Sequence, residues 1–129
     1  IANRAEPGKR PRSSMSPTLV FDGSGSLVMA IGSPGGSRII GYVVKTLIAA
    51  LDWGMDMDAA IDAPYFINRN GTTDLEKGSR LEALKPTLEA MGHKVKLISN
   101  ASGLHGIRTT PQGLDGGADK RREGIVLGD

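Results

Sequence analysis

Gly32-Ser33-Pro34-Gly35-Gly36-Ser37-Arg38 lies where an extended apolar run at 27–31 gives way to a helical pattern that begins near Ile39. A strand, a glycine-rich turn and a helix in that order can hold negative charge, because the helix N-terminus offers unpaired N–H groups and a favourable dipole. Gly35 and Gly36 can adopt positive φ, and they have no Cβ to keep a ligand away from the backbone. The bound charge could be a phosphate, a carboxylate or a developing oxyanion, and the turn alone does not choose among them.

The segments on either side of this turn predict an antiparallel hairpin followed by a long helix. Residues 17–21 and 27–31 are typical of strands joined by a turn at 22–26, and few of their residues alternate cleanly, so we expect both faces to be covered. Ser37 is the expected N-cap of the helix, and Gly54 its end. Its core-facing stripe is predicted to be Ile40, Val43, Val44, Leu47, Ile48 and Leu51.

The rest of the chain predicts short alternating elements. The first is a helix capped by Asp56 or Asp58 and stopped by Pro64, followed by extended segments at 64–68 and 72–76 around the Asn70-Gly71 turn. Next comes a helix that a capping box at 79–82 opens and that Pro86 splits. A strand from Val95 to Leu97 and a hairpin of 104–109 and 113–118 complete the chain. In the third helix, Leu81, Leu84, Leu88 and Met91 are expected to face inward. The fold class is therefore α/β of the α+β kind, with mostly antiparallel strands.

Composition narrows the classes of function. The 129 residues suit one domain or part of one, and the absence of cysteine excludes disulfides, thiolate metal sites and cysteine nucleophiles. The longest apolar run, at 39–51, is too short to span a bilayer. The aspartates at 52, 56, 58 and 62 lack EF-hand spacing and an accompanying histidine, so we assign them to capping and helix surfaces and expect no metal and no cofactor.

Basic residues gather at Lys9-Arg10-Pro11-Arg12 and at Lys120-Arg121-Arg122, within a net charge of +2. No aromatic stacking platform accompanies either cluster, so we interpret both as solvated or ion-paired surface and expect no nucleic-acid partner. His93 and His105 are expected to be surface or structural residues.

A second stretch lies upstream of the glycine turn: Lys9 to Thr18 reads "KRPRSSMSPT", about twenty residues before "GSPGGSRI". The pair closely resembles the C-terminal part of the small subunit in the gamma-glutamyltranspeptidase (glutathione hydrolase) family. The resemblance continues in "LDWGMDMDAAIDAPYF", "EKG", "LEAMGHKV" and the final "GGADKRREGIVLGD", so it covers essentially the whole chain. Lys120 stands where the family pattern has proline, a change we expect to affect only the local backbone.

The resemblance implies part of an N-terminal-nucleophile hydrolase, a four-layer αββα sandwich. In that family a precursor cleaves itself, and the freed threonine attacks a gamma-glutamyl carbonyl with its own α-amine as base. The motif match assigns the oxyanion hole to the N–H groups of Gly35 and Gly36. It assigns the substrate α-carboxylate to Ser13 and Ser14. The alternatives are that these serines cap turns in a loop and that the glycines serve a tight strand-to-helix turn.

No threonine of this chain matches the nucleophile, whose segment is expected upstream of Ile1. We therefore interpret 1–129 as a C-terminal fragment, with an extended substrate loop at 1–16 and an α/β body at 17–129, inactive by itself. Its expected partners are the large subunit, the missing part of the small subunit, a gamma-glutamyl substrate such as glutathione, and water, an amine or a peptide as acceptor. The resemblance implies a periplasmic or secreted protein, with the cytoplasm left open.

Two other functions remain open at this stage. The turn at Gly32–Ser37 could serve a phosphate-binding module, although it lacks the lysine of a P-loop and the spacing of a dinucleotide fingerprint. The chain could also be a catalytically inactive scaffold or interaction domain. For the fragment interpretation, apolar surface meant for the missing portion would favour homo-oligomers.

Overall fold

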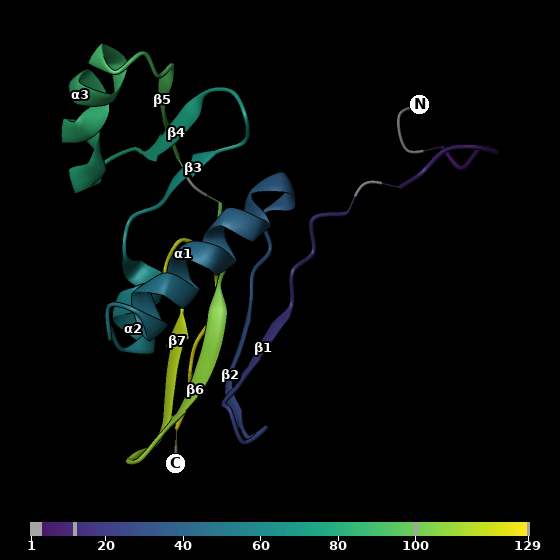
Figure 1. Cartoon of the computed structure of the whole chain (residues 1–129), viewed down its shortest axis with the longest axis vertical. Helices are drawn as coiled ribbons and strands as arrows, with labels where there is room; N and C mark the ends of the chain where they lie inside the picture. The colour runs from purple at the N-terminus through teal and green to yellow at the C-terminus, as the bar shows by residue number, and fades with distance from the viewer. Residues whose placement is uncertain (1–3, 12, 100, 129) are drawn as a thin grey trace.

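The computed structural model describes residues 4–11, 13–99 and 101–128. Its larger sheet has the strand order β1-β2-β6-β7, and every neighbouring pair is antiparallel. The strands are β1 (Thr18–Phe21), β2 (Leu27–Gly32), β6 (His105–Thr110) and β7 (Gly113–Ala118). Both predicted hairpins are confirmed, and the glycine turn links β2 to the helix packed on the sheet (Figure 1).

One face of this sheet is covered by α1 (Ile39–Leu51) and α2 (Met57–Asp62). Two strand glycines let α2 lie close to the sheet. A Cβ on Gly106 would stand 2.4 Å from Met57 Cε, and one on Gly117 would stand 2.8 Å from Ile61 Cδ1. Asp56 is confirmed as the N-cap of α2, because its Oδ1 accepts a hydrogen bond of 2.7 Å from the N–H of Ala59.

The second sheet contains β3 (Phe66–Asn68), β4 (Thr73–Glu76) and β5 (Val95–Ile98). The β3–β4 pair is antiparallel and turns at Asn70, whose φ is 64°, as the Asn-Gly signal predicts. β4 and β5 are parallel, and the crossover between them holds a 3-10 turn, η2 (Arg80–Leu84), followed by α3 (Lys85–Ala90). Pro86 explains why η2 and α3 are separate elements. It lies in the first turn of α3, where the backbone N–H that proline lacks has no acceptor within the helix.

The predicted inward stripe of the third helix is partly wrong. Leu84 and Met91 are exposed, and Leu81 and Leu88 are half-buried. The crossover carries no buried residue. It therefore packs only lightly on the rest of the described chain.

The predicted core stripe of α1 has the wrong phase. The helix buries Ile39, Tyr42, Val43, Thr46, Ala49 and Ala50. Only Val43 of the predicted stripe is buried, whereas Ile40, Val44, Ile48 and Leu51 are exposed. The helix is apolar on most of its circumference, so hydropathy alone does not select the core face. Small residues at 49 and 50 let the true face approach the sheet closely.

Ser37 is not the N-cap of α1. A 3-10 turn, η1 (Gly36–Arg38), comes first, and Arg38 occupies the cap position without a capping side-chain bond. The hydroxyl of Ser37 instead accepts a hydrogen bond from Arg69 on the β3–β4 turn. The helix ends as predicted near Gly54, which has φ 69°.

The opposite face of the larger sheet is only partly covered within the described residues, whereas we expected both faces to be covered. Its exposed apolar side chains are Leu19, Phe21, Leu27, Ile107 and Leu114. The C-terminal segment crosses part of this face, where Val126 packs on Gly116. None of the helices in the described parts of the chain is long and apolar enough to cross a membrane.

The described residues before β1 form no helix or strand, and Figure 1 shows them extending away from the body. Lys9 is ion-paired with Glu6 at 3.6 Å, as expected for a solvated basic cluster, and Arg12 of that cluster lies outside the described residues. The C-terminal cluster is ion-paired too. Lys120 reaches Asp58 at 3.4 Å and Asp62 at 3.8 Å.

Candidate functional site

The two sequence motifs leave the larger sheet at the same end. Thr18, at the start of β1, pairs with Ile31 near the end of β2, so the segment with Ser13 and Ser14 departs where the glycine turn begins. The first residue of β6, His105, pairs with Gly32 at this end as well. Among the described residues, no hydrogen bond joins Ser13 or Ser14 to Gly35 or Gly36. The strand register therefore brings the two motifs to the same end of the sheet, but the two serines and the two glycines do not contact each other directly within the described residues.

Gly35 and Gly36 have the backbone conformation that the motif requires, with φ of 139° and 58°. A Cβ on Gly35 would stand 2.5 Å from Tyr42 Cε2, so any side chain there would force the Tyr42 ring to move. A Cβ on Gly36 would meet nothing within 4 Å, so the space beside that residue is open. Successive N–H groups in such a turn make a concavity suited to an anion. The pair thus combines a tightly packed position with an open one.

Both sheets hold the turn in place. Arg38 donates to Asp74 Oδ2 on β4 through Nη2 at 2.7 Å and through Nε at 3.1 Å, and Asp74 is buried. On the other side, a Cβ on Gly103 would stand 2.8 Å from Pro34 Cγ, which shows how closely the segment before β6 approaches. The hydroxyl of Ser33 donates to the carbonyl of Pro34 at 2.7 Å. The turn is therefore anchored to both sheets.

Ser13 and Ser14 make local hydrogen bonds. The hydroxyl of Ser13 accepts from the N–H of Met15 at 3.3 Å, and the carbonyl of Ser14 accepts from the hydroxyl of Ser16 at 3.1 Å. These bonds agree with the turn-capping alternative. They leave the hydroxyl of Ser14 without a described partner, so the assignment to substrate binding stays a prediction.

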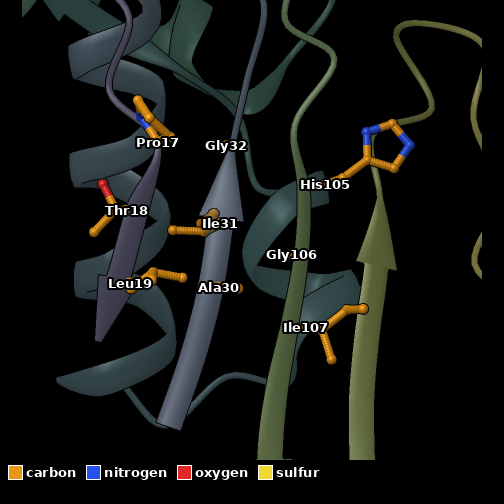
Figure 2. Close-up of a pocket in the computed structure, with 9 residues that line it drawn as sticks. All are labelled: Pro17, Thr18, Leu19, Ala30, Ile31, Gly32, His105, Gly106 and Ile107. Carbon is orange, nitrogen blue, oxygen red and sulfur yellow. The ribbon is translucent and has the colours of Figure 1, made fainter. Parts of the chain in front are cut away.

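A hollow of about 550 Å³ lies beside this end of the sheet, on the face away from α1 (Figure 2). It is almost wholly apolar, and its lining includes Thr18, Leu19, Ile31, His105 and Ile107. The ring of His105 contacts the carbonyl of Gly103 through Nδ1 at 3.2 Å. The residues that the structure describes contain no group of three or more His, Cys, Asp or Glu side chains arranged to hold a metal ion.

A cluster of charged residues apart from the glycine turn was not predicted from the sequence. The Arg121 cluster consists of Lys45, Tyr65, Glu76, Asp119 and Arg121. Arg121 pairs with Glu76 through Nη2 and Oε2 at 3.0 Å and with Asp119 through Nη1 and Oδ1 at 3.1 Å. The ring of Tyr65 lies 4.0 Å from Lys45 Nζ and 4.7 Å from Arg121 Cζ. Arg121 was expected at the surface, but it is the centre of a mostly buried network.

Lys45 is only 6% exposed although it carries an ammonium group. Its Nζ donates to the carbonyls of Ala60 at 2.7 Å and Ala63 at 2.8 Å. Burial, together with the charge of Arg121, lowers the pKa of Lys45 to about 8. Burial also raises the pKa of the Tyr65 phenol. The only signal available in the sequence was Asp119 two residues before Arg121; their partners at 45, 65 and 76 are remote.

Comparison with known proteins agrees with this geometry. The family model described as gamma-glutamyltranspeptidase matches residues 1–128. The chain is 41% identical over 123 residues to the glutathione hydrolase proenzyme of Escherichia coli (strain K12), covering 93% of the chain and 21% of that protein. It is 34% identical over 132 residues to the corresponding proenzyme of Bacillus subtilis (strain 168), covering 98% of the chain and 22% of that protein.

Solved structures agree as well. A gamma-glutamyltranspeptidase from Pseudomonas nitroreducens complexed with L-DON superposes with a TM-score of 0.84 at 28% identity, covering 100% of this chain and 69% of that one. An acivicin-inhibited gamma-glutamyltranspeptidase gives a TM-score of 0.81 at 33% identity, covering 95% of this chain and 68% of that one.

The antiparallel sheet, its helical layer and the glycine turn at the sheet edge thus define part of an N-terminal-nucleophile hydrolase. The chain belongs to the gamma-glutamyltranspeptidase family. It spans about a fifth of the length of each of the two glutathione hydrolase proenzymes compared above.

Proposed function

We propose that this chain is the C-terminal portion of a gamma-glutamyltranspeptidase that cleaves gamma-glutamyl amides such as glutathione. The observation that carries the proposal is the turn at Gly35 and Gly36, with positive φ at both residues and open space beside the second. This turn lies at the sheet end from which the Ser13–Ser14 segment also departs. Family membership and the fold support the same assignment.

In this proposal the nucleophile is an N-terminal threonine that autocleavage frees on a preceding segment. Its hydroxyl attacks the gamma-glutamyl carbonyl and passes its proton to its own α-amine. The N–H groups of Gly35 and Gly36 donate to the oxyanion, where losing one donor costs roughly 3 kcal/mol. As the tetrahedral intermediate collapses, the threonine α-ammonium returns its proton to the leaving nitrogen, the C–N bond breaks, and the amine departs to leave a gamma-glutamyl ester on threonine. Water or an acceptor amine then attacks the ester and releases glutamate or a new gamma-glutamyl amide.

Ser13 and Ser14 bind the substrate α-carboxylate in this proposal. The partners of the chain are a large subunit and the preceding part of the small subunit. The exposed apolar sheet face, with Leu19, Phe21 and Ile107, is the surface that the rest of the protein would cover. The chain alone is then inactive and prone to associate with itself. We assign the protein to the periplasm or the extracellular space.

The experiment uses the intact protein and a chromogenic gamma-glutamyl anilide. Autocleavage into two subunits on a gel, with release of the aniline, is the expected result. Gly36→Ala should lower kcat about a hundredfold, because the methyl group would enter the space where the oxyanion binds.

Gly25→Ala is the matched control. Gly25 also has positive φ, 86°, and open space at its Cβ, but it lies in the β1–β2 turn at the far end of the sheet. A folded, uncleaved and inactive wild-type protein would instead favour the scaffold function. Thermal protection of such a protein by a nucleotide would favour the phosphate-binding function.

A further inference from the structure

A basic pocket of about 400 Å³ lies beside the glycine turn, between η1, the β3–β4 turn and β5. Its lining is mostly polar and includes Arg38, Arg69, Thr72, Asp74 and Lys96. In Figure 1 the β3–β4 turn lies toward the N-terminal end of α1, the end that the glycine turn enters. The pocket is therefore next to the proposed oxyanion hole and separate from the positions assigned to the glutamyl group.

The cations of this pocket outnumber its carboxylate. Asp74 is engaged by Arg38 through both Nε and Nη2, at 3.1 and 2.7 Å. Arg69 donates to the neutral hydroxyl of Ser37 and has no ion pair among the described residues. Lys96, the strand neighbour of Asp74, likewise has no ion pair in the described part of the chain. Two positive charges therefore face the pocket without a counter-ion.

We propose that Arg69 and Lys96 bind the C-terminal carboxylate of a peptide at this site. The peptide is either the leaving group of the gamma-glutamyl substrate or the acceptor of the gamma-glutamyl group. A guanidinium bound to a single hydroxyl keeps donors free for a carboxylate, and an ammonium group adds a second positive charge. The inference rests on the proposed function. It adds a specificity determinant for peptides with a free carboxylate over neutral amines.

Chain geometry allows this contact. Ser37 directly follows Gly36, so their Cα atoms are about 3.8 Å apart. The part of glutathione beyond the scissile bond is a dipeptide, which spans about 7 Å when extended. A carbonyl seated at Gly36 can therefore place the dipeptide carboxylate near the guanidinium that contacts Ser37. An anilide leaving group has no such carboxylate and cannot use the pocket.

The test compares glutathione with its C-terminal amide on the intact, processed enzyme. The wild type should show a kcat/KM about tenfold to a hundredfold higher for the carboxylate form, because a charge-assisted hydrogen bond is lost in the amide. The difference should lie mainly in KM, since the carboxylate is remote from the reacting carbonyl. Arg69→Gln and Lys96→Gln together should bring the ratio close to one, and Arg69→Lys should restore part of it.

Arg80→Gln, in the exposed η2 turn outside the pocket, is the matched control and should leave the ratio at its wild-type value. A wild type that does not distinguish the two substrates would overturn the inference. The same holds if Arg69→Gln and Lys96→Gln together keep the wild-type ratio. A wild type that releases no aniline from a gamma-glutamyl anilide would instead refute the proposed function, so the two failures are distinguishable.

Discussion

The glycine turn and the Arg121 cluster use charge in opposite ways. At the turn, Gly36 stands beside open space, and the neighbouring Arg69 meets only a hydroxyl. In the cluster, Arg121 is paired with both Glu76 and Asp119, and Lys45 donates to two carbonyls. Donors that already have their acceptors stabilise the fold, whereas donors left over near open space are available to a ligand. The contrast distinguishes the proposed binding site from a structural network on the basis of this chain's own contacts.

The Arg121 cluster should give the largest effect on stability. Arg121→Met leaves the carboxylates of Glu76 and Asp119 without their cation, and breaking such a buried pair costs about 3–5 kcal/mol. Urea unfolding of the intact protein measures the loss. Lys120→Met is the control from the same basic cluster. Its ion pairs with Asp58 and Asp62 are exposed and contribute about 0–1 kcal/mol.

If Arg121→Met and Lys120→Met lower the free energy of unfolding by the same amount, the distinction between a buried cation and a surface cation in this segment would be wrong. A loss confined to Arg121→Met would show that the cluster joins the C-terminal segment to β4.

The two adjacent glycines test the comparison within the turn itself. Gly35→Ala places a methyl group 2.5 Å from the Tyr42 ring at φ 139°, so we expect a destabilisation of about 2 kcal/mol. Gly36→Ala has open space around its methyl group and should cost less stability than Gly35→Ala. Melting temperatures of the two variants, measured side by side with their turnover, check the expectation. Equal melting temperatures would contradict the assignment of a packed and an open position.

The turn could be found in the sequence because its signal is local. Glycines between an apolar strand pattern and a helix pattern specify positive φ and close approach within a few residues. The hairpin turns are local as well; for example, Asp22 Oδ1 accepts from the N–H groups of Ser24 and Ser26 at 2.8 and 2.9 Å. The cap of α2 by Asp56 is specified in the same way.

The remaining features depend on contacts between distant segments. The core face of α1 is chosen by the sheet and by α2, and the helix itself is apolar on both candidate faces, so its phase was predicted wrongly. The Arg121 cluster joins positions 45, 65, 76, 119 and 121, which no short pattern connects. The basic pocket unites η1, the β3–β4 turn and β5 for the same reason.

The most gradual expected effect is the pH dependence that Lys45 gives to the cluster. Burial lowers the pKa of Lys45 from 10.5 to about 8 in the folded protein. Between these values the unfolded chain binds a proton that the folded protein does not, so this residue makes stability rise with pH, by at most about 1.4 kcal/mol per pH unit. Relative to Lys45→Met, the wild type should therefore gain stability as the pH rises from about 8 toward 10.5, with no such gain below pH 8.

Urea unfolding of the intact wild type and of Lys45→Met across this range measures the difference, and the other lysines titrate in both proteins and cancel. The groups that face Lys45 do not reverse the sign. Arg121 stays protonated, and burial holds the pKa of Tyr65 above its ordinary value. The negative charges of Asp119, Glu76 and Asp62 oppose the lowering of the Lys45 pKa without cancelling it. Parallel stability curves would mean that Lys45 keeps its proton throughout. The two carbonyl acceptors and the Tyr65 ring would then outweigh its burial, and this ammonium would be as fully paired as Arg121.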